Sequence, residues 1–283
     1  MNQWRKGIAS WRVGRVLYQS IPFTWLLPAA EDQARCHNGP VVAGGPAVKL
    51  MGAPWAETPD SVPFDVLAFH NPLATFTTRG CPNRCRFCAV PKIEGDFMEL
   101  ESWKPAPVIC DNNLLACSRH HFESVIESLK PFPYADFNQG LEAGRLKEWH
   151  VDLIRGLKHV KIRFAFDHPK FEAVVHDAIN LCRSHGLSDI GIYCLIGFND
   201  TPESARERLE LVRSWGIMPN PMRYHPLDAI EKNSFVAEGW TDAELKRIMK
   251  YYSRLAYLGN ACSFDEFKYQ QIDERQTTMF GGI

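Results

Sequence analysis

Residues 160–196 read VKIRFAFDHPKFEAVVHDAINLCRSHGLSDIGIYCLI. Apolar runs of strand length lie at the two ends, over residues 160–166 and 189–196, and a helical pattern separates them. The helix is expected to bury one apolar stripe and to end at Gly186. The stripe consists of Phe171, Val174, Val175, Ala178, Ile179 and Cys182. A strand, a helix and a second strand in this order predict a βαβ unit with two parallel strands.

The same alternation runs from residue 73 to about residue 230. The predicted strands are Leu73–Arg79, Pro107–Asp111, Tyr134–Asn138, Val160–Phe166, Asp189–Ile196 and Pro221–His225. Further helices are expected to begin after the cap Ser118 and at Thr201-Pro202, and the second of them to stop near Gly216. Alternating units of this kind predict an α/β fold with a parallel sheet, either open or closed into a barrel. Six units correspond to an incomplete (β/α)6 barrel, with the active site at the carboxyl ends of the strands.

The chain is expected to have three regions. Residues 1–72 form a small N-terminal α/β cap, in which Val41–Pro46 is a buried strand that runs into a turn. Residues 73–230 form the partial barrel. Residues 231–283 form a C-terminal helical extension, opened by a capping box over Thr241–Glu244.

Composition excludes several classes of protein. The chain has 283 residues, of which 45% are hydrophobic and 23% charged, and a formal net charge of −1, so no global basic field argues for nucleic acid. Nine cysteines without disulfide-framework spacing favour a reducing compartment. No apolar run is long enough to span a membrane, and we expect no membrane partner and a cytoplasmic location.

Residues 77–88 read TTRGCPNRCRFC and directly follow the first predicted strand. Cys81, Cys85 and Cys88 supply three thiolates, which suit a soft metal ion or an iron–sulfur cluster. A closed [4Fe–4S] site or a structural zinc site has four ligands, so three leave one position open for a small molecule. The alternative is a zinc site completed by a distant His or Cys. The loop also carries basic residues that either balance a negatively charged cluster or bind substrate. They are Arg79, Arg84, Arg86 and Lys92.

The Cys-x3-Cys-x2-Cys spacing, with Phe87 immediately before the third cysteine, resembles the signature of the radical S-adenosylmethionine (SAM) superfamily. The Thr-Arg-Gly run before Cys81 is similar to the branch that contains methylthiotransferases and cobalamin-binding-domain radical SAM proteins. The resemblance covers roughly residues 73–230 and implies one [4Fe–4S] cluster on the three cysteines, with SAM at the open iron. It further implies that an electron from the cluster cleaves SAM, and that a 5′-deoxyadenosyl radical then takes a hydrogen atom from the substrate. The electron comes from an external donor such as flavodoxin or ferredoxin.

The resemblance also implies cofactor contacts. Phe87 is expected to pack near the adenine of SAM, and Asp111, Asn112 and Asn113, which end the second strand, to hold its amino group. Residues 191–198 resemble the segment whose backbone approaches adenine, with Ile196 as a cofactor contact. The Asp-Asn-Asn run is otherwise ordinary turn chemistry.

Arg163 and Asp167 alternate with the apolar residues of the fourth strand, so both are expected to point into the barrel. The resemblance makes Asp167 the candidate for the SAM ribose, and a structural ion pair between Arg163 and Asp167 is the alternative. Asn138 and Gln139, after the third strand, are expected either to reach SAM or substrate or to form a plain turn.

The candidate catalytic or substrate contacts are Arg163, Tyr193, Arg223 and His225, the last being otherwise an ordinary loop histidine. Cys110, Cys117 and Cys194 lie near predicted strand ends, where one could donate a hydrogen atom to a substrate radical. Cys182 is expected in the core.

The substrate is open at this stage. The Val41–Pro46 segment looks like the tail of a cobalamin-binding domain, without an Asp-x-His-x-x-Gly motif, so we interpret the cap as a remnant that acts as a lid without B12. The absence of a second cysteine cluster argues against methylthiolation. Compact relatives of this branch occur among phage-encoded enzymes, which makes the rearrangement of an amino-acid-modified thymine in DNA one candidate reaction, on a flipped-out base. The alternatives are a peptide, an RNA base, a small metabolite, or a non-enzymatic Fe–S or zinc binding module.

Overall fold

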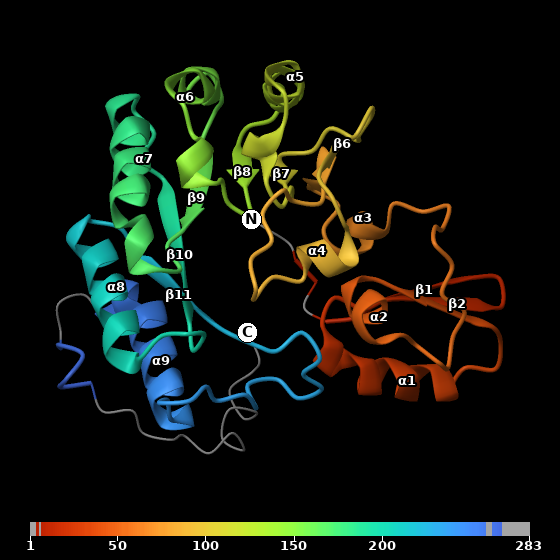
Figure 1. Cartoon of the computed structure of the whole chain (residues 1–283). Coiled ribbons are helices and arrows are strands. Elements are labelled where there is room, and N and C mark those ends of the chain that lie inside the picture. Colours follow the sequence, from red (N-terminus) through yellow and green to blue (C-terminus); the bar gives the residue numbers. More distant parts are fainter. Residues whose placement is uncertain (1–3, 6, 259–261, 268–283) are drawn as a thin grey trace.

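The computed structural model describes residues 4, 5, 7–258 and 262–267. It is an α/β protein with a six-stranded, all-parallel sheet that alternates with helices, and a small mixed sheet near the N-terminus (Figure 1). The strands of the large sheet are β4 (Ala74–Thr75), β7 (Val108–Ile109), β8 (Ala135–Phe137), β9 (Val160–Ala165), β10 (Ile190–Ile196) and β11 (Pro219–Arg223). They lie side by side in the order in which they occur along the chain, and each neighbouring pair is parallel. The predicted parallel α/β sheet is thereby confirmed.

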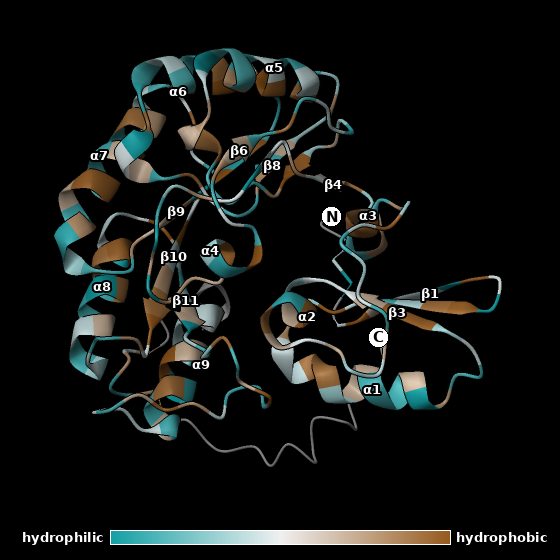
Figure 2. Ribbon diagram, turned by 45° about the vertical axis from the view of Figure 1, so that its right-hand side comes forward, coloured by the Kyte–Doolittle hydropathy of each residue, from teal (hydrophilic) through white to brown (hydrophobic). Residues whose placement is uncertain are grey.

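Helices follow successive strands and form an arc along one face of the sheet (Figure 2). They are α5 (Arg119–Leu129), α6 (Glu148–Ile154), α7 (Glu172–Ser184), α8 (Pro202–Ser214) and α9 (Asp242–Leu258). Short 3-10 helices lie at Thr24–Leu26 (η1), Leu114–Ala116 (η2), Ala143–Arg145 (η3) and Pro169–Phe171 (η4). Of the predicted C-terminal helical extension, the described residues contain α9; the rest falls largely outside them.

The two faces of the sheet follow from the alternation of side chains in β9 and β10. Ile162 and Phe164 are fully buried in one core cluster with α7 residues such as Ile179. The register pairs Phe164 with Ile192 and Ala165 with Tyr193. Phe164 and Ile192 therefore lie on one face of the sheet, and Ala165 and Tyr193 lie on the other. We call the helix-covered face the outer face and the opposite one the inner face.

The predicted helix boundaries are confirmed by their caps. The Ser118 hydroxyl accepts from the His121 N–H, and the Thr201 hydroxyl accepts from the Ser204 N–H. At α9 the capping box is reciprocal, because Thr241 and Glu244 each accept from the other's backbone N–H. The buried apolar stripe of α7 contains fewer residues than expected: Val175, Ala178, Ile179 and Cys182. Phe171 and Val174 are 43% and 40% exposed, because Phe171 precedes the first turn and Val174 lies beside the buried residues.

The first predicted strand is wrong in its extent. Residues 73–79 form two short strands, of which only β4 joins the large sheet. The second, β5 (Thr78–Arg79), pairs antiparallel with β6 (Met98–Glu99), which the sequence analysis missed. The break occurs because the N–H groups of Thr77 and Thr78 donate to the Asp111 carboxylate instead of to a neighbouring strand.

The N-terminal part contains a three-stranded sheet, in which β2 pairs antiparallel with β1 and parallel with β3. Its strands are β1 (Ala9–Val13), β2 (Val16–Ser20) and β3 (Val41–Gly44), and its helices α1 (Leu27–Arg35) and α2 (Pro46–Met51). The expected buried strand at Val41 is β3, which runs into a turn at Gly45. Two short helices, α3 (Val66–His70) and α4 (Val90–Ile93), complete the fold. None of the described helices is long and apolar enough to cross a membrane.

The N-terminal part touches the large sheet near both of its edges. Close to β4, Trp4 and Leu67 pack on a buried cluster that includes Val108. Beyond β11, the Thr24 hydroxyl donates to the Ala229 carbonyl, and the ring of Trp25 lies 4.9 Å from that of His225. The N-terminal part therefore bridges the two edges of the sheet.

A buried ion pair shapes the turn after β10. Arg208 of α8 donates to the Asp200 carboxylate and to the Leu195 carbonyl, both at 2.7 Å, and the two charged side chains are 3% and 5% exposed. Asp200 in turn accepts from the N–H groups of Gly197 and Phe198. The pair thus holds the backbone that presents Phe198.

Arg208→Ala is predicted to lower the free energy of unfolding by about 3–5 kcal/mol, since it leaves the Asp200 carboxylate buried without its partner. Urea denaturation measures the change. Arg155→Ala, which removes a 57% exposed arginine from an ion pair with Asp152, serves as the control and should cost at most about 1 kcal/mol. Equal losses for the two variants would contradict the prediction.

Candidate functional site

The candidate site is the loop that carries Cys81, Cys85 and Cys88, between β5 and α4 at the carboxyl end of the sheet's first strand. All three cysteines are free; Cys85 is exposed and the other two are partly exposed. The Cys88 N–H donates to the Cys85 carbonyl at 3.0 Å, which closes a turn between these two cysteines.

Glu94 holds the beginning of this loop. Its carboxylate pairs with Arg79 at 2.9 Å and accepts from the Gly80 N–H at 2.7 Å and from the Asn112 amide at 2.8 Å. Gly80 has φ +70°, and a Cβ there would meet the Asp96 carbonyl at 2.1 Å, so the turn into the loop requires glycine. Asn112 therefore lies at the loop, where its amide is bound to Glu94.

Asp111 fixes the approach to the loop from the other side. Its carboxylate accepts from the Thr77 N–H at 2.6 Å, from the Thr78 N–H at 3.1 Å and from the Thr77 hydroxyl. Burial raises the pKa of this carboxyl, and these hydrogen bonds act in the opposite direction. The side chain is 2% exposed. The structure thus gives Asp111 a role in holding the backbone ahead of Cys81, without access to a bound molecule.

Asn113 is the residue of the Asp-Asn-Asn run that contacts a cysteine. Its amide nitrogen donates to the Cys81 sulfur at 3.5 Å and to the Glu142 carboxylate at 2.6 Å. Arg145 donates to the same Glu142 oxygen at 2.7 Å. The Oδ1 atom of the Asn113 side-chain amide is buried and has no hydrogen-bond partner among the described residues. A buried acceptor of this kind suits a ligand that donates a hydrogen bond.

Asp167 and Arg163 lie on the inner face but do not pair with each other. Arg163 forms its ion pair with Asp136 of β8, so the alternative of an Arg163–Asp167 pair is wrong. Asp167 accepts from the Leu195 N–H at 2.9 Å, and burial raises its pKa. Burial also raises the pKa of Cys85, and the Cys88 and Cys81 thiols, followed by the Asp167 and Glu142 carboxylates, act in the same direction.

A row of aromatic rings joins the loop to the last strands. The ring centroid of Phe87 lies 5.5 Å from that of Phe198, which lies 4.7 Å from Tyr224, and Phe235 follows at 5.4 Å. Phe87 thus packs the loop against the carboxyl end of β10. This contact is compatible with the expected position beside adenine.

Two predicted site residues point elsewhere. Arg223 shares the outer face with Ile196, and its guanidinium donates to Asp242 and to the carbonyls of Asn233 and Phe235. Its expected contact with substrate is therefore replaced by a structural one. The Ile196 side chain is fully buried in the core, although its carbonyl is at the strand end and accepts from the Tyr224 N–H.

The other predicted residues lie around the inner face. The Tyr193 hydroxyl donates to the Asn138 carbonyl at 3.4 Å, and Gln139 is exposed after β8. His225 packs on Trp25, and burial lowers its pKa, so the ring is neutral at pH 7. Its Nδ1 atom is buried without a partner among the described residues.

Burial keeps the remaining cysteines near strand ends in the protonated thiol form. Burial raises the pKa of Cys110, Cys117 and Cys194 to about 12 in each case. Cys194 lies on the outer face within the core, away from the cysteine loop. Cys182 is fully buried in the same core, as predicted.

The donor chemistry of the loop fits a thiolate-bound group, but its sulfurs are not preassembled. Within the ranges that the structure describes, no three Cys, His, Asp or Glu side chains are grouped closely enough to hold a metal ion. Three free thiols on one loop nevertheless provide the soft donor set that an iron–sulfur cluster requires.

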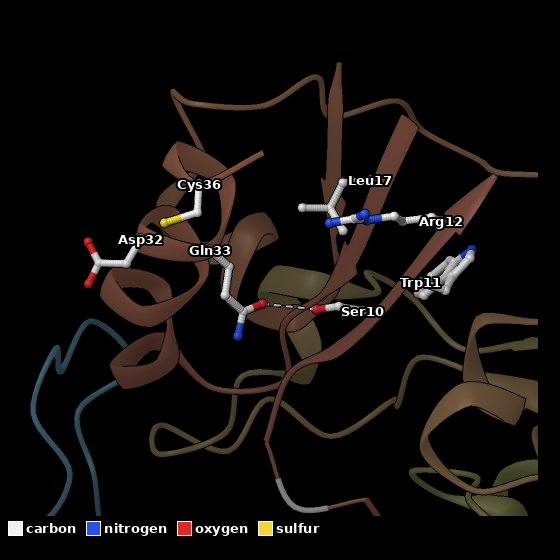
Figure 3. Close-up of a pocket in the computed structure, with 7 residues that line it drawn as sticks. All are labelled: Ser10, Trp11, Arg12, Leu17, Asp32, Gln33 and Cys36. Atoms are coloured by element: carbon white, nitrogen blue, oxygen red, sulfur yellow. Dashed lines mark hydrogen bonds between the residues drawn. The ribbon is translucent and has the colours of Figure 1, made fainter. Parts of the chain in front are cut away.

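A shallow pocket of about 550 Å³ lies on the N-terminal part, between α1 and the strands β1 and β2 (Figure 3). It is lined by Ser10, Trp11, Arg12, Leu17, Asp32, Gln33 and Cys36. Ser10 and Gln33 are bonded to each other at 3.0 Å, and Asp32 is 76% exposed. Among the lining side chains, the Trp11 Nε1 atom is buried without a hydrogen-bond partner among the described residues.

The sequence analysis missed four residues that organise the site. Glu94, Asp136, Glu142 and Phe198 each act through a partner distant in sequence. Position gave a partial signal, since Glu142 and Phe198 lie within four residues of the ends of predicted strands, and Phe198 belongs to the segment 191–198. The chain matches no protein-family model and, in sequence, no curated protein.

The Asp111 contacts predict how firmly the cysteine loop is held. Asp111→Asn places an NH2 group where two backbone N–H groups need an acceptor. It should lower the free energy of local unfolding of the loop by about 1.5–3 kcal/mol, which increases the population of the open loop at least about tenfold. Trypsin cleavage after the exposed residues Arg84 and Arg86 reports this opening. Asp32→Asn, at a carboxylate on α1 that is 76% exposed, is the control and should cleave at the unsubstituted rate. Equal cleavage of both variants would show that Asp111 does not hold the loop.

Proposed function

We propose that this chain is a radical SAM enzyme, with one [4Fe–4S] cluster on Cys81, Cys85 and Cys88 and with its large sheet as an incomplete (β/α)6 barrel. The observation that carries the proposal is a loop with three free cysteines at the carboxyl end of the first of six parallel strands. Parallel α/β barrels place their chemistry at this end. When bound, the cluster would supply the electron that cleaves SAM, and the resulting 5′-deoxyadenosyl radical would take a hydrogen atom from the substrate.

The neighbouring residues suit the binding of SAM. The unpaired Oδ1 atom of the Asn113 side chain can accept from the ammonium group of SAM, and the charge of the Asp167 carboxylate, which follows β9, acts on Cys85. Phe87, Phe198 and Tyr224 form an apolar wall that would exclude water from a reactive intermediate.

The inner face exposes side chains that a substrate could contact. Ala165 and Asn220 are exposed there, and Met222 is 49% exposed, although all three belong to strands of the sheet. Tyr193 and Asn138 line the same face. These residues, with Asn220, provide both apolar contact and hydrogen-bonding groups.

For the substrate we propose a modified nucleobase carried on DNA. Arg86 and Lys92 are exposed beside the cysteines and would meet phosphates, whereas Arg79 and Arg84 are paired with Glu94 and Asp96. A base would have to leave its stack to reach the inner face. Transfer of deuterium from labelled candidate substrates into 5′-deoxyadenosine tests this choice.

Anaerobic reconstitution with iron and sulfide tests the enzyme itself. We expect about four irons per chain, a spectrum that changes on addition of SAM, and 5′-deoxyadenosine after reduction. Cys85→Ala should lose SAM cleavage, while Cys36→Ala, at an exposed cysteine of the N-terminal part, should retain it. Stoichiometric zinc with intact SAM would instead indicate a metal-binding module without catalysis.

A further inference from the structure

The sulfur of Cys81 lies in a hydrogen-bonded setting built by distant segments. It accepts from the Asn83 N–H at 3.4 Å, within its own loop, and from the Asn113 side chain at 3.5 Å. Asn113 follows β7 and is 3% exposed, so water does not compete for this contact. The side-chain donor is thus part of the fold and independent of the cysteine loop.

Glu142 determines which way the Asn113 amide faces. The Glu142 carboxylate can only accept, so the Asn113 group 2.6 Å from it must be the NH2 group. The same NH2 group then faces Cys81. Arg145 holds Glu142 in place through a bond at 2.7 Å. A chain of contacts, Arg145–Glu142–Asn113–Cys81, therefore runs from the segment after β8 to the cysteine sulfur.

Donors and charges beside a thiolate-bound cluster act on its reduction potential in opposite directions. An N–H donor to a ligand sulfur stabilises the more negative, reduced form and raises the potential. A carboxylate nearby destabilises the reduced form through charge repulsion and lowers the potential. Asn113 provides the donor to the Cys81 sulfur, and Glu142, bonded to the same Asn113 nitrogen, provides the carboxylate.

We infer that Asn113 and Glu142 are positioning residues that set the reduction potential of the cluster through Cys81, Asn113 raising it and Glu142 lowering it. This inference rests on the proposed function, because it requires a cluster on the three cysteines. It gives the Asn113 side chain two roles. Its Oδ1 atom would contact SAM, and its Nδ2 atom donates to the Cys81 sulfur.

Redox titration of the reconstituted protein without SAM, followed by EPR, tests the inference. Asn113→Ala should shift the midpoint potential to a more negative value, and Glu142→Gln to a more positive one. The glutamine keeps an oxygen that accepts from Asn113 while it removes the charge. Glu148→Gln, at a carboxylate 77% exposed on α6, removes the same charge far from the loop and should leave the potential unchanged.

The outcomes separate this inference from the proposed function. Shifts in opposite directions support it, and two unchanged potentials, or two shifts in the same direction, overturn it. If Asn113→Ala does not take up a cluster, the Glu142→Gln result decides alone, and an unchanged potential again overturns the inference. An unsubstituted protein that binds no four-iron cluster overturns both proposals, whereas a loaded cluster with unresponsive potentials overturns this one only.

Discussion

The hydrogen bonds from Thr77 and Thr78 to the Asp111 carboxylate are the constraint on which the candidate site depends. They take two backbone N–H groups that would otherwise continue the first strand, and so turn the chain out of the large sheet ahead of Cys81. Because Asp111 follows β7, the same contact ties the loop to the neighbouring strand. Burial of this carboxyl is unfavourable by itself, and its three donors offset that cost.

Carboxylates recur around the cysteine loop, and each has a definite structural partner. Glu94 binds Arg79 and Gly80 at the start of the loop, and Glu142 binds Arg145 and Asn113 on its far side. These pairings position the loop through backbone and side-chain donors from separate segments. They also place negative charge near the three thiols. Two basic residues of the loop neutralise nearby carboxylates, Arg79 that of Glu94 and Arg84 that of Asp96.

The sequence was sufficient for the parts of the fold that depend on local pattern. Alternation in residues 160–166 and 189–196 correctly predicted two parallel strands, and Ser118, Thr201 and Thr241 correctly predicted helix starts. Parallel topology also predicted that the strand ends would gather near the cysteines. What failed was the choice of partners. Arg163 pairs with Asp136 on the neighbouring strand instead of with Asp167, four residues further along its own chain. Neighbouring strands bring side chains on the same face closer together than four residues of extended chain do. No local pattern marks such a pair.

The N-terminal part illustrates the same limit at a larger scale. The segment at residues 41–46 led us to interpret this part as a lid, and in the structure it contacts the rest of the fold at several points. Trp4 packs against the cluster beside β4, Thr24 bonds to Ala229 beyond β11, and Lys49 of α2 donates to the Ile93 carbonyl of α4 at 3.1 Å. An open parallel sheet leaves two edge strands that need cover. The N-terminal part thus contacts both edges of the sheet and the helix that follows the cysteines. Its movement away from the sheet would break all three contacts at once. A substrate must therefore reach the inner face while these contacts remain in place.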